Sequence, residues 1–242
     1  LYELHFFFTV ALNSIIHPPI YKRRAYALLF LGNKRLKKRA GNVTILFMKT
    51  IVAASGNKAK IREIQEIFQG FTVIPMQEAG FWGDIEENGS TFTENALIKA
   101  RAVSEKLGCI ALADDSGLCM YALRGAPGIY SARFCGRHGD DKANNRLLLE
   151  KLSDETDRRG YFESAVAICF PDGRTLTASG RTFGVILPEE HGENGFGYDP
   201  LFFSTEIDKC FGIASAEEKN AVSHRGRALR ALAEKMRAEG IL

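Results

Sequence analysis

Two spacings of hydrophobic residues alternate along the chain after residue 48. Short apolar runs such as Thr50–Ala54 are typical of buried strands, whereas the spacing of Ile61, Ile64, Ile67 and Phe68 indicates one face of a helix. The spacing predicts strands at 50–54, 72–75, 109–113, 161–170, 174–181 and 200–203, and helices at 58–68, 91–107, 140–152 and from about 223. Helices that alternate with strands in this way predict an α/β fold.

Turn and capping residues define where several of these elements begin and end. Pro171-Asp-Gly173 joins two apolar runs and is a strong hairpin signal, and residues 185–187 are expected to extend the second strand. Thr91-Phe-Thr-Glu94 is a capping-box pattern, and Ser223 suits the N-cap of the last helix. Residues 124–134 form an irregular loop rich in Gly and Pro. Because a hairpin is antiparallel, the predicted sheet is mixed rather than purely parallel, and helices cover it.

Composition is that of an ordinary globular protein, but the charge is unevenly distributed. The 242 residues are 45% hydrophobic and 25% charged, which fits one large domain or two lobes with an ample core. Residues 1–47 carry eight Lys and Arg against one acid, so residues 48–242 carry 24 against 28, a net charge of −4. A mildly acidic body argues against a nucleic-acid partner, and nothing in it indicates a membrane partner.

The first 47 residues differ from the rest. Their apolar stretch, His5–Ile16, is too short to span a bilayer. The basic clusters follow that stretch, whereas a signal peptide places its basic residues first. The first methionine, Met48, stands just before a clear strand. We interpret residues 1–47 as an N-terminal extension outside the functional protein, with residues 48–242 as the functional domain. A basic targeting or membrane-surface arm is the alternative.

Cysteine usage indicates a reducing compartment. The five cysteines are an odd number, are widely spaced and include no C-x-x-C pair, which fits neither a disulfide framework nor a zinc site. Cys109 and Cys169 lie in apolar runs and are expected to be buried free thiols. We therefore expect a cytoplasmic protein.

The most informative chemical feature is an acid pair that follows an apolar strand. Asp114 and Asp115 stand where the strand 109–113 is expected to end. Two neighbouring carboxylates raise each other's pKa, and a divalent cation removes that cost. Mg²⁺ is typically held by one or two carboxylates together with substrate phosphates. The pair therefore predicts Mg²⁺-dependent phosphate chemistry, with Glu86 and Glu87 in the preceding loop as further acids.

Two cationic segments are candidates for binding phosphate. Ser55–Lys60 joins a strand to a helix, and the free N–H groups at a helix start attract phosphate. The alternative is a solvated turn with surface lysines. Asn95 and Lys99 are four residues apart and share one helix face. Lys99 is expected either to reach an anion in a cleft or to pair with Glu94 in solvent.

Two further segments are candidates for binding a base. In Gly195–Asp199, two glycines flank Phe196, which frees its ring to lie flat on a planar ligand; the alternative places Phe196 and Tyr198 in the core. His224 and Arg225, at the start of the last helix, are expected to face outward into an adjoining cleft, or else to be surface side chains. Hydrogen-bond donors there suit a 6-oxo purine, because a 6-amino group would meet donor with donor.

Six segments together resemble the inosine/xanthosine triphosphate pyrophosphatases of the Ham1 type. The segments are Ser55–Lys60, Thr91–Ala96 with Lys99, Ala113–Leu118, Gly125–Arg133, Gly195–Pro200, and Glu218–Lys219 with Ser223–Gly226. They occur in the family's order and at its usual spacings, from about Met48 to the C-terminus. Residues 1–47 depart from the pattern, because family members start near the first strand.

The resemblance implies a two-lobed α/β/α fold, with a long central mixed sheet, a cleft between the lobes, and usually a homodimer. It implies that residues 48–242 are a nucleoside-triphosphate pyrophosphatase domain that hydrolyses ITP, dITP and XTP to the monophosphate and pyrophosphate with Mg²⁺. Pyrophosphatases for other nucleotides, such as modified pyrimidines, and a purine-nucleotide-binding module without catalysis are the alternatives.

The resemblance also assigns roles by position. Asp115 is implied as the metal-linked general base, and Glu87 with Asp115 as the metal ligands. The implied substrate-binding residues are Ser55, Gly56, Asn57, Lys58, Ala59 and Lys60 for the phosphates, Ser116, then Phe196, Gly197, Tyr198 and Asp199 for base and sugar, and Lys219, His224 and Arg225. Charge on the departing pyrophosphate is expected to be stabilised by Lys60, Lys99 and Lys219.

Overall fold

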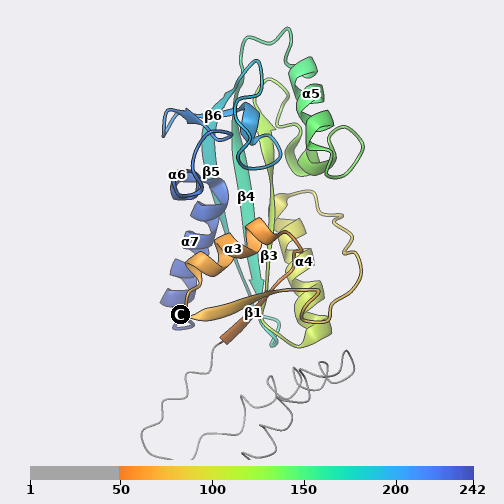
Figure 1. Ribbon diagram of the computed structural model, residues 1–242. Coiled ribbons are helices and arrows are strands. Elements are labelled where there is room, and N and C mark those ends of the chain that lie inside the picture. The colour runs from red at the N-terminus through yellow and green to blue at the C-terminus, as the bar shows by residue number, and fades with distance from the viewer. Residues whose placement is uncertain (1–48) are drawn as a thin grey trace, which may run out of the picture.

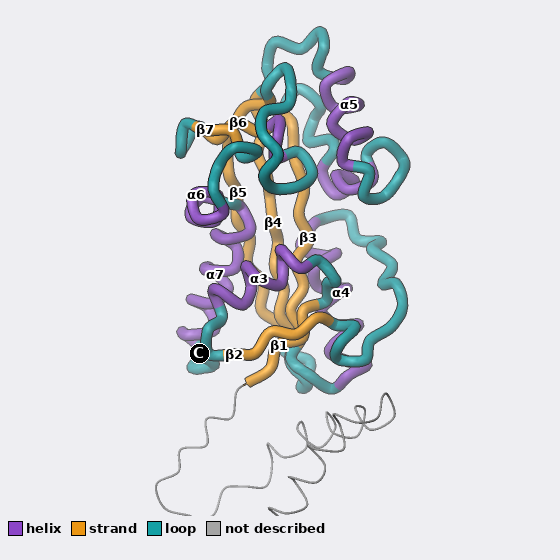
Figure 2. The backbone as a smooth tube through the Cα atoms, viewed as in Figure 1, coloured by secondary structure: helices purple, strands orange, loops and turns teal. Residues whose placement is uncertain are grey.

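The computed structural model describes residues 49–242, which fold around one seven-stranded sheet (Figures 1 and 2). The strand order is β2-β1-β3-β4-β5-β6-β7. The strands are β1 Lys49–Ala53, β2 Phe71–Pro75, β3 Ala111–Met120, β4 Arg159–Cys169, β5 Thr175–Ile186, β6 Phe202–Ser204 and β7 Lys209–Cys210. The interpretation of residues 1–47 lies outside the described residues.

The sheet is mixed, as predicted. β1 pairs in parallel with both β2 and β3, and every pair from β3 to β7 is antiparallel. The turn at Pro171–Gly173 joins the long strands β4 and β5, which pair over their whole length. These long central strands extend past the short β1 and β2, so they carry the sheet into a second region.

Helices cover both faces of the sheet in the lobe that contains β1 and β2 (Figure 1). Helix α3 (Lys58–Ile67) and helix α7 (His224–Ala238) cover one face, where Ile51, Leu112 and Val166 contact the apolar side of α7. Helix α4 (Phe92–Leu107) covers the other face against Val52, Ala113 and Ala167. The alternation of strand side chains between faces produces these two separate cores.

A second lobe surrounds the far ends of the long strands. It contains helix α5 (Asp141–Lys151), the short helix α6 (Ala216–Val222), the 3₁₀ turns Gly128–Arg133 and Asp199–Leu201, and strands β6 and β7. Its core packs Leu118 and Phe162 of the sheet against Leu148 of α5 and the rings of Phe202 and Phe211. The expected two-lobed α/β/α fold is therefore confirmed.

Several predicted boundaries are wrong. Strand β3 continues through Asp114 and Asp115 to Met120, because these residues keep pairing with β4 in register. The strand expected at 200–203 is a 3₁₀ turn as far as Leu201 and begins only at Phe202. The capping box at Thr91 is half formed: its hydroxyl accepts from the Glu94 N–H, but the Glu94 carboxylate accepts from Ser90 instead of Thr91.

Between residues 49 and 242, no helix is both long enough and apolar enough to cross a bilayer.

Candidate active site

The two adjacent acids lie in the middle of β3 and face opposite sides of the sheet. Successive side chains of a strand alternate between faces, so Asp114 points toward α3 and α7 while Asp115 points toward α4. The prediction of a single carboxylate pair at a strand end is therefore wrong. The negative charges of the two acids are balanced by different cations rather than shared across one site.

Asp114 is the centre of a buried ion-pair network. Its Oδ1 lies 2.7 Å from Lys60 Nζ, and its Oδ2 accepts from Arg225 Nε at 2.8 Å. Burial alone would raise the pKa of Asp114, but the charges of Lys60 and Arg225 outweigh burial and hold the pKa well below its ordinary range. Asp114 is thus a permanent anion that cannot accept a proton at neutral pH.

Arg225 completes this network from the start of α7. Its side chain is 2% exposed, and it also donates to Glu63 through Nη1 at 3.2 Å and to the Ser116 hydroxyl through Nη2 at 3.1 Å. Sequence reasoning missed Glu63, although its spacing of three residues from Lys60 on α3 places both on one helix face. The expectation that Arg225 faces outward is wrong, because its guanidinium is an internal anchor.

His224 is also buried rather than outward-facing. Its ring is 5% exposed and stacks on Phe162, with centroids 4.8 Å apart and planes at 16°. Burial lowers the pKa of His224 well below its ordinary value, and the nearby charges of Arg225 and Lys219 lower it further. The ring is therefore neutral near pH 7, and Nδ1 has no hydrogen-bond partner among the described residues.

Asp115 occupies a different electrostatic environment on the α4 face. The Asn95 amide donates to its Oδ2 at 3.1 Å, and Lys99 Nζ lies 3.4 Å from its Oδ1. Burial raises the pKa of Asp115; Lys99 opposes that rise, and Glu87 adds to it. A carboxylate with a raised pKa is better suited to accept a proton than one with a depressed pKa.

Lys99 joins Asp115 to the loop that precedes α4. Its Nζ lies 2.8 Å from Glu87 Oε2, so the alternative pairing with Glu94 does not form. Burial would lower the pKa of Lys99, but the charges of Asp115 and Glu87 outweigh burial and raise it. Asp114 also contributes to the pKa of Lys99, so the two faces remain electrostatically coupled through the sheet.

The 55–60 segment caps α3 and is open to solvent. Asn57 is the N-cap, and its side chain accepts from the N–H groups of Ala59 and Lys60 at 2.9 and 3.2 Å. Ser55 accepts from the Asn57 N–H at 3.1 Å, while Gly56 and Lys58 are exposed. Lys60 instead turns back to Asp114, so one lysine of this segment is anchored and the other is free to meet a ligand.

The 195–199 loop separates its two aromatic rings. Tyr198 is buried and donates from its hydroxyl to the Ser131 carbonyl at 2.9 Å, whereas the Phe196 ring is 39% exposed. Lys219 Nζ lies 2.5 Å from Asp199 Oδ2 and 4.9 Å from the centre of the Phe196 ring. Arg225 Cζ lies 5.6 Å from the same centre, so Phe196 links the Asp114 network to the Lys219–Asp199 pair.

This arrangement can be compared with known proteins. A family model described as the Ham1 family matches residues 51–235. The chain belongs to the Ham1 family. A dITP/XTP pyrophosphatase from Bacillus anthracis is 45% identical over 195 residues, which cover 78% of this chain and 96% of the relative. A dITP/XTP pyrophosphatase from Geobacter sulfurreducens is 45% identical over 80% of this chain and all of the relative.

A solved structure gives the same family and fold. The Staphylococcus aureus Ham1 protein is 43% identical and superposes with a TM-score of 0.73, covering 79% of this chain and all of that one. The fold class expected from the sequence is thus shared with a solved Ham1 protein.

Glu87 and Asp115 are the two residues predicted from the sequence as metal ligands. Both carboxylates lie against one ammonium, that of Lys99, so their oxygens converge on one point. Within residues 49–242 no group of three or more His, Cys, Asp or Glu side chains forms a complete metal site. Two converging carboxylates fit Mg²⁺, which takes its remaining ligands from substrate phosphates and water.

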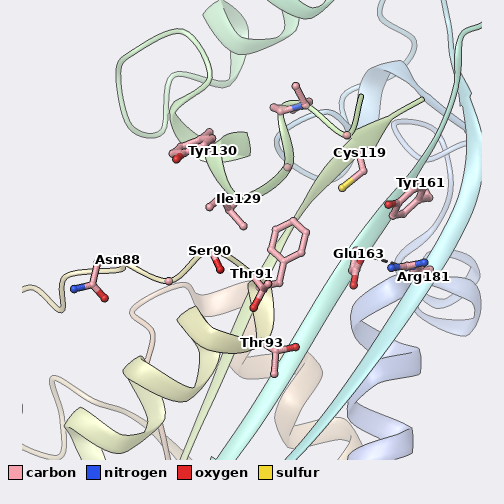
Figure 3. A pocket seen from close by; sticks show the side chains of 16 residues that line it. Asn88, Ser90, Thr91, Thr93, Cys119, Ile129, Tyr130, Tyr161, Glu163 and Arg181 are labelled. Atoms are coloured by element: carbon pink, nitrogen blue, oxygen red, sulfur yellow. Dashed lines mark hydrogen bonds and ion pairs between the residues drawn. The ribbon is translucent and has the colours of Figure 1, made fainter. Parts of the chain in front are cut away.

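A separate cavity of about 790 Å³ opens on the α4 side of the sheet (Figure 3). It lies between the start of α4, near Ser90 and Thr93, and the 125–130 loop with Tyr130, and the Glu163–Arg181 ion pair lies along its edge. None of the substrate-binding or metal-binding residues expected from the sequence lines it. This cavity is therefore distinct from the charged centre around β3.

Proposed function

We propose that this chain hydrolyses the non-standard purine nucleoside triphosphates ITP, dITP and XTP to the monophosphate and pyrophosphate with Mg²⁺, and so removes them from the nucleotide pool. The observation that carries the proposal is that the two consecutive acids, Asp114 and Asp115, have different charged neighbours and opposite pKa shifts. Asp115 has a raised pKa beside Glu87 and Lys99, while Asp114 holds Arg225, one of the two cations beside the Phe196 ring. The names of the relatives, dITP/XTP pyrophosphatase, support the substrate class.

Glu87 and Asp115 would hold the Mg²⁺. When bound, Mg²⁺ neutralises phosphate oxygens and lowers the pKa of a coordinated water. Asp115 accepts a proton from the water that attacks the α-phosphorus, while the Asn95 amide keeps the carboxylate in orientation through Oδ2.

The cationic side chains stabilise the negative charge of the departing pyrophosphate. Lys99 lies beside Asp115, Lys60 pairs with Asp114 on the other face of β3, and Lys219 pairs with Asp199 in the 195–199 loop. Phosphoryl transfer depends on positioning and charge neutralisation more than on covalent help. Donors fixed in advance by buried carboxylates require no reorganisation during the reaction.

The base would lie against Phe196 and be recognised by hydrogen-bond donors close to the start of α7. Lys219 Nζ, which is 12% exposed and 4.9 Å from the centre of the Phe196 ring, and the buried Arg225 guanidinium, whose Cζ is 5.6 Å from it, are donors beside the ring that a carbonyl acceptor of the base would meet. A 6-oxo purine offers that acceptor, whereas a 6-amino purine would leave a buried donor unpaired at a cost of about 1–3 kcal/mol. This preference predicts that ATP is a poor substrate.

The decisive experiment measures pyrophosphate release from ITP, dITP, XTP, ATP and modified pyrimidine triphosphates, with Mg²⁺ and with excess chelator. We expect release from the 6-oxo purines that depends on Mg²⁺. Equal release under exhaustive chelation would overturn the metal assignment. Binding of ITP without any pyrophosphate release would instead identify a nucleotide-binding module.

We propose in addition that the chain forms a homodimer and acts in the cytoplasm. Large exposed rings gather near the 790 Å³ cavity, since Tyr121, Tyr130 and Phe183 are 48%, 57% and 51% exposed, and aromatic residues are enriched at protein interfaces. All five cysteines are free thiols, which supports a reducing compartment. Sedimentation of the purified protein at micromolar concentration measures the dimer directly, and a monomer mass would contradict it.

A further inference from the structure

The loop that carries Phe196 is fixed by carboxylates from two distant parts of the chain. The Phe196 N–H donates to Asp199 Oδ2 at 2.8 Å, within the same loop. The Gly197 N–H donates to Asp141 Oδ2 at 2.8 Å, and Asp141 belongs to the first turn of α5. Asp199 belongs to one of the six segments that resemble the family, whereas Asp141 lies outside all of them.

The two hydrogen bonds together restrain the backbone that carries the Phe196 ring. They hold the peptide groups on either side of Phe196, so rotation about both backbone bonds of this residue is restricted. Gly197 has a φ of +62°, a left-handed conformation that suits glycine and turns its N–H toward Asp141. The ring itself is 39% exposed and lies beside Lys219 and Arg225, so the restrained backbone acts on its orientation together with these two side chains.

Asp141 is not required to cap its own helix. The neighbouring Asp140 is the N-cap of α5, and its Oδ1 accepts from the Ala143 N–H at 3.0 Å. The Asp141 carboxylate is therefore available for the contact across to the loop. The two consecutive acids have separate partners, and this separation allows the contribution of each to be tested alone.

We propose that Asp141 is a positioning residue for substrate: it fixes the 195–199 loop so that the Phe196 ring stands ready to stack on the nucleotide base. Asp141 acts through Gly197 and Phe196 and need not touch the substrate. The inference rests on the proposed function, because it takes the base to bind against Phe196. The ordered loop lowers the entropy that the protein loses when the base binds.

The test compares Asp141→Ala, Asp141→Asn and Asp140→Ala in the full-length protein. KM and kcat for pyrophosphate release from ITP are measured with Mg²⁺, and the exchange rate of the Gly197 amide is measured by hydrogen exchange without ligand. We expect Asp141→Ala to raise KM and the exchange rate about tenfold each, with kcat within about twofold of the wild type. Asp141→Asn should restore most of both, because its side-chain oxygen still accepts the Gly197 N–H.

Asp140→Ala is the matched control for the stability of α5. It should lower the melting temperature but leave KM and Gly197 exchange unchanged, since it removes the helix cap and the exposed ion pair with Arg137 but not the Asp141 contact. The inference is overturned if Asp140→Ala raises KM as much as Asp141→Ala, if asparagine fails to rescue, or if Asp141→Ala leaves KM or Gly197 exchange at the wild-type value. If the wild type releases no pyrophosphate from ITP, the proposed function fails, and Gly197 exchange alone decides whether Asp141 fixes the loop.

Discussion

Replacement of Asp114 by asparagine would leave two cations facing a neutral side chain inside the protein. Arg225 is 2% exposed and Lys60 is 20% exposed, while the Asp114 side chain is 2% exposed. Removing one partner of a buried ion pair costs about 3–5 kcal/mol, because the remaining charge is left without compensation. Glu63 still neutralises part of the Arg225 charge at 3.2 Å, and water reaches Lys60, so we expect a value near the lower limit, about 3 kcal/mol.

A loss of about 3 kcal/mol corresponds to a fall in melting temperature of roughly 6–12 °C for a domain of this size. Calorimetry and urea unfolding of Asp114→Asn beside the wild type measure it. Asp172→Asn is the matched control, because Asp172 and its partner Arg174 are 55% and 61% exposed, and an exposed pair contributes about 0–1 kcal/mol.

The contribution of Asp114 to the free energy of unfolding should depend on pH in a direction that its pKa shift determines. The folded pKa of Asp114 is depressed below its unfolded value, so its contribution is fully present above the unfolded pKa, about 3.9, and is lost as the pH falls below it. The difference between wild type and Asp114→Asn should therefore be constant from about pH 5 to 8 and shrink in more acidic buffer. The reasoning is refuted if Asp114→Asn melts within about 2 °C of the wild type near pH 7, or if Asp172→Asn loses as much.

Two further substitutions separate chemistry from stability. Burial raises the pKa of Asp115, so the contribution of this group to stability is lost as the pH rises from the ordinary Asp value through the raised one. Asp115→Asn, measured near pH 7 with chelator, should therefore melt at or above the wild-type temperature. Its turnover of ITP with Mg²⁺ should fall about 10²–10⁴-fold. Near-normal turnover would refute the assigned base. Phe196→Ala should raise KM for ITP roughly 5- to 150-fold with little change in kcat or melting temperature, because its ring is 39% exposed and stacking contributes about 1–3 kcal/mol. A fall in melting temperature with an unchanged KM would assign Phe196 to the core.

The elements that the sequence predicts well are those determined by nearby residues. Thr91 and Ser223 each cap a helix through their own side chains, and Pro171–Gly173 turns the chain between β4 and β5. The helix α6 could have been found in the same way, because Ser215 and Glu218 form a complete capping box. Its seven residues carry too little hydrophobic periodicity to be recognised otherwise.

The charged centre could be predicted only in part, because its contacts join residues far apart in the sequence. Arg225 meets Glu63 from 162 positions away and Asp114 from 111 positions away. Such pairings depend on how α3 and α7 lie side by side on the sheet, which no local pattern specifies. The outward direction expected for Arg225 failed for this reason, since the buried carboxylates that receive it were not visible from its own segment.

The alternation of β3 resolves how two neighbouring acids can both be ionised in a folded protein. The two side chains lie on opposite faces, where Lys60 and Arg225 neutralise one and Lys99 the other. The same alternation forces a difference in their chemistry. The acid bound by two cations has too low a pKa to take a proton, so Asp114 can only hold other groups in place. The acid beside Glu87 keeps a raised pKa, and that cost in stability is what leaves Asp115 able to act as a base.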